Sequence, residues 1–248
     1  MDPSMHTNAA IWTSEEYVRT RAAQAEQRER ENAERWRILG ELLPFEEREV
    51  FTFLDLGAGT GSAARSILDR YPRSTAILSD FSPQMIAVGE EEMASYAGRY
   101  RYVEFDMSTS SWPAAIPDVL AAIVSSMSVH HLPDDRKEGL FAEIFARLAP
   151  GGWYLNYDTV SATDPIVAAT WGRTADRRDP EAAAKRLHRT PEERARHENH
   201  LRHVIPLSQQ LEYLAAAGFA GIDVYWKHLD DVIYGGQRPS PPPAALAP

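Results

Sequence analysis

The strongest structural signal in this chain of 248 residues is a short apolar run that ends in a glycine-rich turn. Residues 50–56 (VFTFLDL) predict a buried strand, Gly57, Gly59 and Gly61 follow directly, and residues 62–71 continue in a helical pattern. Glycines let the backbone adopt positive φ and approach a ligand closely. The helix that follows directs its free N–H groups toward the same place. Strand, turn and helix together predict a ligand-binding loop.

The same alternation continues along the chain and predicts the fold class. Short apolar runs predict strands at 76–79, 100–105, 119–125 and 153–157, with helices at 83–96, 134–148 and 207–217. Strands that alternate with helices indicate an α/β fold with a mostly parallel sheet. Residues 222–227 and 231–234 predict a final antiparallel pair. We therefore expect a Rossmann-like, seven-stranded sheet with helices on both faces.

Three segments lack the alternation of strands and helices, which suggests a domain organisation. Residues 45–160 and 206–238 form the predicted core, whereas 161–205 are polar, helical in composition and too long for a plain connection. We expect this segment to be a helical insertion over the active site. Residues 1–44 predict an arm and a long charged helix that serves either as a lid or as the contact of a homodimer. Residues 239–248 (PSPPPAALAP) predict a disordered tail.

Composition narrows the class of partner. The formal net charge of −10 disfavours a nucleic-acid substrate, because a polyanion would be repelled on average. The chain has no cysteine, which excludes disulfides, a cysteine nucleophile and thiolate metal sites. No apolar run is long enough to cross a membrane, and the first residues lack the features of a signal peptide. The expected location is cytoplasmic, and the expected partner is a small-molecule substrate.

The spacing of the glycines separates two cofactor classes. Dinucleotide-binding loops prefer G-x-G-x-x-G, with the pyrophosphate on the helix end. Here the spacing is G-x-G-x-G, and Asp55 stands two positions before Gly57. A carboxylate at that position disfavours an anionic ligand and favours a cationic amino acid moiety. An NAD-dependent oxidoreductase is therefore the weaker alternative.

This loop resembles the first motif of the class I S-adenosylmethionine-dependent methyltransferases of the small-molecule type. The turn at 148–152 (LAPGG) and the closing stretch 214–227 also resemble this family. The resemblance implies S-adenosyl-L-methionine as the cofactor. In the loop it implies cofactor contacts from Gly57, Ala58, Gly59 and Gly61. It also assigns Asp55 to the cofactor site, where this residue either fixes the loop or contacts the amino group of the cofactor indirectly.

Two further strand ends carry the same resemblance. Asp80 closes the second strand, where the family binds the ribose hydroxyls, and Phe81 and Met85 follow on the adenine side. Asp106 and Met107 follow the third strand, where the family often places an acidic residue near the adenine amino group. An exposed aspartate after a strand is also a common cap, so Asp106 has a structural alternative.

The run of residues 124–132 (VSSMSVHHL) resembles the family stretch that ends in two histidines and a leucine. By this resemblance Ser125 and Ser126 face the cofactor. A histidine can move protons near neutral pH, which makes His131 and His130 catalytic candidates. Because such a pair occurs in relatives with unrelated substrates, the alternative is that both shape the floor beneath the cofactor.

The acceptor side is predicted less sharply. Asp158 follows the fifth strand and is a candidate base. The residues expected to face the acceptor, or simply to pack, are Tyr17, Arg21, Tyr157, Trp171 and His200. His197, His200 and His203 recur at helical spacing, but we interpret them as lid residues and expect no metal.

The resemblance implies in-line methyl transfer, in which the protein mainly holds the reactants in geometry and excludes water. A base is needed only where the acceptor must lose a proton. The sequence also leaves open an enzyme of the same fold that uses the cofactor without methylating, and a non-catalytic binding protein.

Overall fold

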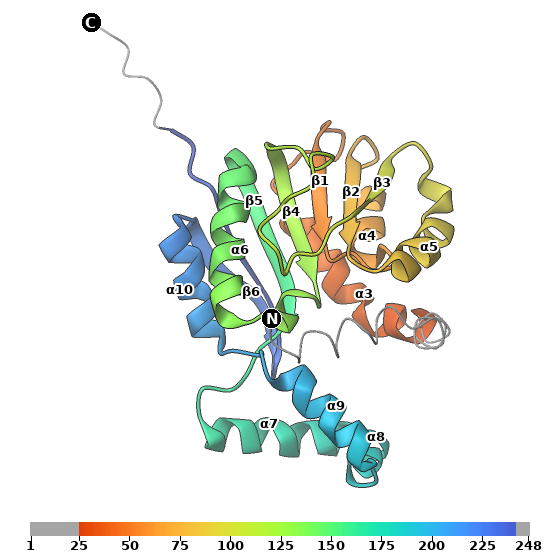
Figure 1. Ribbon diagram of the computed structural model, residues 1–248, viewed down its shortest axis with the longest axis vertical. Coiled ribbons are helices and arrows are strands. Elements are labelled where there is room, and N and C mark those ends of the chain that lie inside the picture. Colours follow the sequence, from red (N-terminus) through yellow and green to blue (C-terminus); the bar gives the residue numbers. More distant parts are fainter. Residues whose placement is uncertain (1–24, 242–248) are drawn as a thin grey trace, which may run out of the picture.

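The computed structural model describes residues 25–241, which form a seven-stranded sheet in the order β3-β2-β1-β4-β5-β7-β6 (Figure 1). Neighbouring strands from β3 to β5 pair in parallel, and β7 runs antiparallel to both β5 and β6. The predicted fold class is therefore confirmed. The strands are β1 (Thr52–Leu56), β2 (Thr75–Asp80), β3 (Tyr100–Glu104), β4 (Leu120–Ser126), β5 (Leu148–Thr159), β6 (Ala220–His228) and β7 (Asp231–Gln237).

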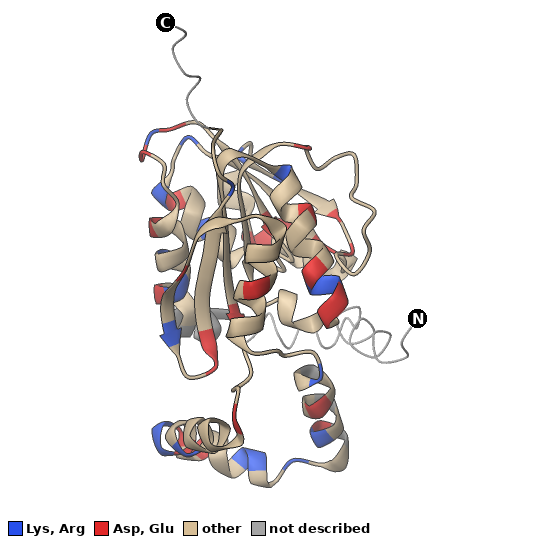
Figure 2. Ribbon diagram, turned by 90° about the vertical axis from the view of Figure 1, so that its left-hand side faces the viewer, with Lys and Arg blue, Asp and Glu red and all other residues tan. Residues whose placement is uncertain are grey.

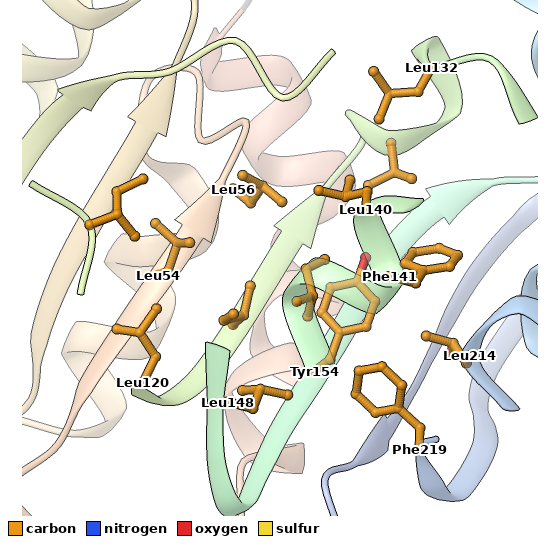
Figure 3. Packing of buried hydrophobic residues seen from close by; sticks show 14 of the residues in the cluster. Leu54, Leu56, Leu120, Leu132, Leu140, Phe141, Leu148, Tyr154, Leu214 and Phe219 are labelled. Atoms are coloured by element: carbon orange, nitrogen blue, oxygen red, sulfur yellow. The ribbon is translucent and has the colours of Figure 1, made fainter. Parts of the chain in front are cut away.

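Helices cover both faces of this sheet. On one face, α3 (Ala25–Leu42) and α4 (Ser62–Arg70) bury Leu39, Ile67 and Leu68 against the strands. On the other face, α6 (Asp134–Arg147) and α10 (Leu207–Ala217) do the same, and Figure 3 shows Leu140, Phe141 and Leu214 packed over Leu54, Leu56 and Tyr154. Each such side chain stabilises the fold by about 1.5–3 kcal/mol.

Parallel pairing brings the strand ends to one edge of the sheet. Leu56 at the end of β1 is in register with Ser79 in β2 and with Ser125 in β4, and Asp80 is in register with Glu104. Helix α5 (Pro83–Glu92) starts directly beyond β2, with Ser82 as its N-cap. The residues that follow β1, β2 and β4 therefore meet at this carboxyl edge, where open α/β sheets bind their ligands.

The insertion is helical, as predicted, and lies beyond the same edge (Figure 1). It consists of α7 (Pro165–Arg178), α8 (Pro180–Leu187) and α9 (Pro191–Leu201). Each begins with a proline behind a side-chain cap, a strong start signal. A bridge between Ser161 and Pro206 joins the two ends of the insertion. Basic and acidic residues both occur along its helices (Figure 2).

Two boundaries differ clearly from the prediction. Strand β5 begins at Leu148 and not at residue 153, because Leu148 pairs with Leu120 and a register shift accommodates the glycines that follow. Helix α5 ends at Glu92, and a separate 3₁₀ turn (Ala94–Tyr96) completes the segment. The predicted long amino-terminal helix is described only as α3, since residues 1–24 and 242–248 lie outside the described part.

Candidate active site

The loop between β1 and α4 has the backbone that its glycines predict. Gly57, Gly59 and Gly61 all have positive φ, of 72°, 55° and 83°. A Cβ on Gly57 would lie 2.6 Å from the Met107 Cε and from the Ser128 Oγ. Any larger residue would therefore both strain the backbone and fill the space that the loop encloses.

Hydrogen bonds hold this loop at its centre. The Gly59 N–H donates to Asp80 Oδ2 (2.9 Å), and the Tyr102 hydroxyl donates to the Gly59 carbonyl oxygen (3.0 Å). The neighbouring Ala58 N–H donates to the Ser79 carbonyl oxygen (2.8 Å). These three bonds tie the loop to β2 and β3, so its shape does not depend on a ligand.

Asp80 lies almost fully buried at the mouth of the loop. Its Oδ1 accepts from the Ser82 N–H (2.9 Å), while Oδ2 accepts from Gly59. Burial raises the pKa of this carboxyl above its ordinary value, and the backbone donors counteract the rise. Because each carboxylate oxygen can accept more than one hydrogen bond, Asp80 can still accept from ligand hydroxyls.

Asp55 lies fully buried behind the loop, with an unused acceptor. Its Oδ2 accepts from the Ala64 N–H in the first turn of α4 (3.1 Å), whereas Oδ1 has no hydrogen-bond partner among the described residues. Burial raises the pKa of Asp55 from 3.8 to about 7, with a smaller contribution from the nearby Asp80 charge. A cationic ligand group beside Asp55 would favour its charged form and lower its pKa, and an anionic group would disfavour the charged form.

The residues predicted for the adenine side surround the same loop. The Met85 Cε lies 3.1 Å from where a Cβ on Gly59 would be, and Met107 borders Gly57. Phe81 is half-buried directly after β2. Asp106 is exposed and its Oδ1 accepts from the Ser108 N–H (2.9 Å), so it also performs the local capping role foreseen as its alternative.

The serines after β4 bind protein groups. Ser125 is buried, and its hydroxyl donates to the Leu56 carbonyl oxygen (2.9 Å), as does that of Ser128 (3.1 Å). The Ser126 hydroxyl accepts from the Trp36 indole N–H of α3 (3.1 Å). Ser125 and Ser126 therefore fix the end of β4 against β1 and α3.

The histidine turn is joined to the end of β5. His130 is 2% exposed and Asp158 is 0% exposed. The His130 Nδ1 lies 2.5 Å from Asp158 Oδ1, and the His130 backbone N–H donates to Asp158 Oδ2 (3.0 Å). The His131 ring packs on that of His130, with centroids 4.0 Å apart. Two predicted catalytic residues, distant in sequence, are thus brought together.

The predicted acceptor residues are scattered. Tyr157 is buried on the opposite face of β5, where its hydroxyl donates to Asn32 Oδ1 of α3 (2.9 Å). Trp171 of α7 is half-buried, and the Lys227 Nζ lies 4.4 Å from its ring centroid. Tyr17, Arg21 and the side chain of His200 lie outside the described residues.

Sequence reasoning missed several polar residues around the histidine turn. Lys137 is fully buried in α6, and its ammonium donates to the carbonyl oxygens of Leu132 (2.6 Å) and His203. Asn156, Gln210 and Tyr234 are also fully buried. Within residues 25–241 no three His, Asp or Glu side chains gather as metal ligands, and no helix there has the length and apolarity to cross a membrane.

Comparison with known proteins agrees with this geometry. Residues 53–152 match the family described as "Methyltransferase domain". That range contains the glycine loop, Asp80 and the histidine turn. Residues 53–152 therefore match a methyltransferase domain, and this match together with the fold supports a class I S-adenosylmethionine-dependent methyltransferase. These findings support the predicted family, enzyme class and cofactor.

Individual relatives match this methyltransferase domain over part of their length. The release factor glutamine methyltransferase of Cereibacter sphaeroides is 32% identical over 106 residues, which cover 41% of this chain and 36% of that protein. The trans-aconitate 2-methyltransferase of an Acidovorax species is 32% identical over 100 residues, which cover 40% and 34%. The chain thus spans about a third of these relatives.

Solved structures share the fold over most of the chain. An O-methyltransferase family protein from Burkholderia thailandensis superposes with a TM-score of 0.65 at 16% identity, covering 92% of this chain and 64% of that one. Human N-acetylserotonin methyltransferase, in complex with SAM, superposes with a TM-score of 0.63 at 15% identity, covering 93% and 58%. At such identities the likeness concerns the fold.

Proposed function

We propose that this protein transfers the methyl group of S-adenosylmethionine to a hydroxyl oxygen of a small-molecule acceptor. The observation that carries the proposal is the Asp158–His130 pair, which adjoins the glycine loop. Ser128, two residues before His130, contacts the position of a Gly57 Cβ. A carboxylate-bound imidazole beside a cofactor loop is suited to remove a proton from a hydroxyl.

The glycine loop and its two aspartates would hold the cofactor. Asp80 would accept from the ribose hydroxyls, and Asp55, whose Oδ1 has no partner among the described residues, would balance the positive charge of the amino acid moiety. The bound cofactor supplies an activated methyl group on a sulfonium. The protein itself positions the acceptor and excludes water.

His130 would act as the general base. Because Asp158 accepts from Nδ1, the neutral imidazole carries its hydrogen there, and Nε2 is the ring nitrogen that would take the acceptor proton. Asp158 also stabilises the imidazolium that this transfer creates. His131, Tyr157 and Trp171 remain predictions for the acceptor side, and Asp106, Phe81, Met85 and Met107 for the adenine side.

A small-molecule acceptor is favoured by charge and architecture. The net charge of −10 disfavours a nucleic acid as the acceptor, because a polyanion would be repelled. The insertion α7–α9 lies beyond the edge at which the acceptor must enter, a place suited to a lid over a small substrate.

The two adjacent histidines provide the test. The wild-type protein, His130→Gln and His131→Gln are incubated with tritiated-methyl S-adenosylmethionine and a panel of phenols, hydroxy acids, carboxylic acids and amines. We expect methyl ethers as products and a loss of turnover of about 10²–10⁴-fold in His130→Gln, with a smaller loss in His131→Gln. Products methylated only at carbon or nitrogen, or full turnover by His130→Gln, would refute the oxygen-directed mechanism.

A further inference from the structure

One face of β5 carries a row of polar side chains inside an otherwise apolar layer. Asn156 and Asp158 alternate with Leu155 and Tyr157, which are buried on the opposite face. They share their own face with Tyr154, whose ring packs near Phe141 with centroids 5.7 Å apart (Figure 3). Asn156 is in register with Tyr234 on β7. Apolar side chains of α6 and α10 cover the row, so each of its polar groups is removed from water.

A chain of hydrogen bonds crosses this layer from α10 to the histidine turn. The Tyr234 hydroxyl donates to Gln210 Oε1 in the first turn of α10. It accepts in turn from Asn156 Nδ2 (2.9 Å). The same amide nitrogen lies 3.4 Å from Asp158 Oδ2. The chain therefore runs from Gln210 through Tyr234 and Asn156 to Asp158.

Asp158 is held by donors on both of its oxygens. Oδ1 accepts from the Thr159 N–H (3.0 Å) and from His130 Nδ1, and Oδ2 accepts from the His130 N–H and faces Asn156 Nδ2. Three of these donors belong to the turn and the strand end themselves. The Asn156 amide alone connects the carboxylate to the sheet interior.

We propose that Asn156, Tyr234 and Gln210 are positioning residues that orient the Asp158 carboxylate and, through it, the His130 imidazole. This inference rests on the proposed function of His130 as the base. The chain fixes the rotation of Asp158, and Asp158 fixes both the tautomer and the ring plane of His130.

A contribution to the stability of the fold does not explain why this series of hydrogen bonds is present. Asn156 Oδ1 and Gln210 Nε2 have no hydrogen-bond partner among the described residues, although both are buried. A buried network that leaves a donor and an acceptor unused contributes less to stability than apolar side chains of similar size. Leucine or phenylalanine at these positions would suit the surrounding layer, which contains Leu140, Leu214 and Val232.

The structure offers a matched control. Tyr154 and Tyr234 are both fully buried on this face, but the Tyr154 hydroxyl has no hydrogen-bond partner among the described residues. Tyr154→Phe and Tyr234→Phe each remove one buried hydroxyl from neighbouring strands. Only Tyr234→Phe interrupts the series of hydrogen bonds that ends at Asp158.

The proposal can be tested on the Nδ1–H resonance of His130, measured in the protein without added ligand. Proton NMR of wild-type protein labelled with ¹⁵N-histidine should show a far-downfield Nδ1–H resonance, assigned by its loss in His130→Gln. Tyr234→Phe should shift or broaden this resonance and speed its exchange with solvent, and Tyr154→Phe should leave it unchanged. Equal spectra for the two phenylalanine variants would overturn the proposal.

Two additions keep the outcome decisive. If Tyr234→Phe does not fold, Gln210→Met removes the hydrogen-bond partner at the α10 end of the series. It should shift or broaden the His130 resonance in the same way, and an unchanged resonance overturns the proposal.

With an identified acceptor, Tyr234→Phe should lower kcat about tenfold without changing KM, the effect of one lost hydrogen bond. A perturbed resonance in a protein that transfers no methyl group would refute the proposed function and leave the positioning intact.

Discussion

The backbone N–H of Gly59 donates a hydrogen bond of 2.9 Å to Oδ2 of Asp80. This bond joins the middle of the glycine loop to the end of the neighbouring strand, so one carboxylate both shapes the loop and remains at its mouth. Tyr102 closes the loop from the other side through the Gly59 carbonyl oxygen. A pre-shaped loop needs little reorganisation when the cofactor binds, which favours affinity.

Asp80→Ala should therefore weaken S-adenosylmethionine binding about 10- to 100-fold, because it removes charged hydrogen bonds to the ligand and to the loop. Isothermal titration measures this effect. Glu104→Ala is the control, since Glu104 is in register with Asp80 at the same sheet edge but is exposed. If Asp80→Ala and Glu104→Ala bind S-adenosylmethionine with equal affinity, Asp80 is not part of the cofactor site.

Gly57→Ala should abolish cofactor binding at a modest loss of stability. The added Cβ meets Met107 and Ser128 at 2.6 Å, in addition to the strain of a φ of 72°. Gly98→Ala, at a φ of 83° in open space, carries the strain alone, about 1–2 kcal/mol. Thermal denaturation and titration of both variants separate strain from crowding. Cofactor affinity that is normal in Gly57→Ala would contradict the assignment of the loop.

Asp55 should make the protein less stable as pH rises from about 4 to 7. Its folded-state pKa of about 7 lies above the ordinary 3.8, so the folded state holds a proton that the unfolded state releases in this window. Each pKa unit corresponds to about 1.4 kcal/mol, so Asp55 accounts for a loss of a few kcal/mol. Urea unfolding of Asp55→Asn should show a higher free energy of unfolding than wild type at pH 8 and little difference at pH 4.

The control for this pH dependence is Asp118→Asn, which changes a 95% exposed carboxylate and should leave the profile unaltered. Cofactor binding adds a second readout, because a cationic group beside Asp55 lowers its pKa. S-adenosylmethionine should therefore release protons on binding at pH 6 to 7, measured by titration in buffers of different ionisation enthalpy. Release that is equal in Asp55→Asn would mean that another group is responsible.

Lys137→Met should loosen the end of the insertion from the histidine turn. The Lys137 ammonium donates to Leu132 in that turn and to His203 after α9, and its loss leaves buried carbonyl groups unpaired, at about 1–3 kcal/mol. Hydrogen exchange should increase around residues 201–206, and the midpoint of thermal unfolding should fall. Exchange rates that stay at their wild-type values would show that this bond does not restrain the insertion.

The fold could be predicted because the local signals agree with one another. The prolines and caps that start α7, α8 and α9 are visible in the sequence, and so is the glycine that ends α10. The start of β5 could not be predicted from Pro150, Gly151 and Gly152, since these residues indicate a turn. Their strand conformation depends on pairing with β4 and β7, which no local pattern reports.

The site was predictable where a motif carries it and not where tertiary pairing creates it. The glycine loop and Asp80 belong to recognisable strand ends. The distance between His130 and Asp158, and the burial of Lys137, follow from how α6 and the histidine turn pack on β5. One local signal was present: Asn156 and Asp158 are polar at alternate positions of an apolar strand, a pattern that places two polar groups on one buried face.

We propose that the glycine loop, Asp55 and Asp80 form the site for S-adenosylmethionine. The most direct test is isothermal titration of the full chain with S-adenosylmethionine, S-adenosylhomocysteine and NAD. We expect binding of the first two in the micromolar range and no binding of NAD. Binding of NAD without binding of either adenosyl compound would contradict this proposal.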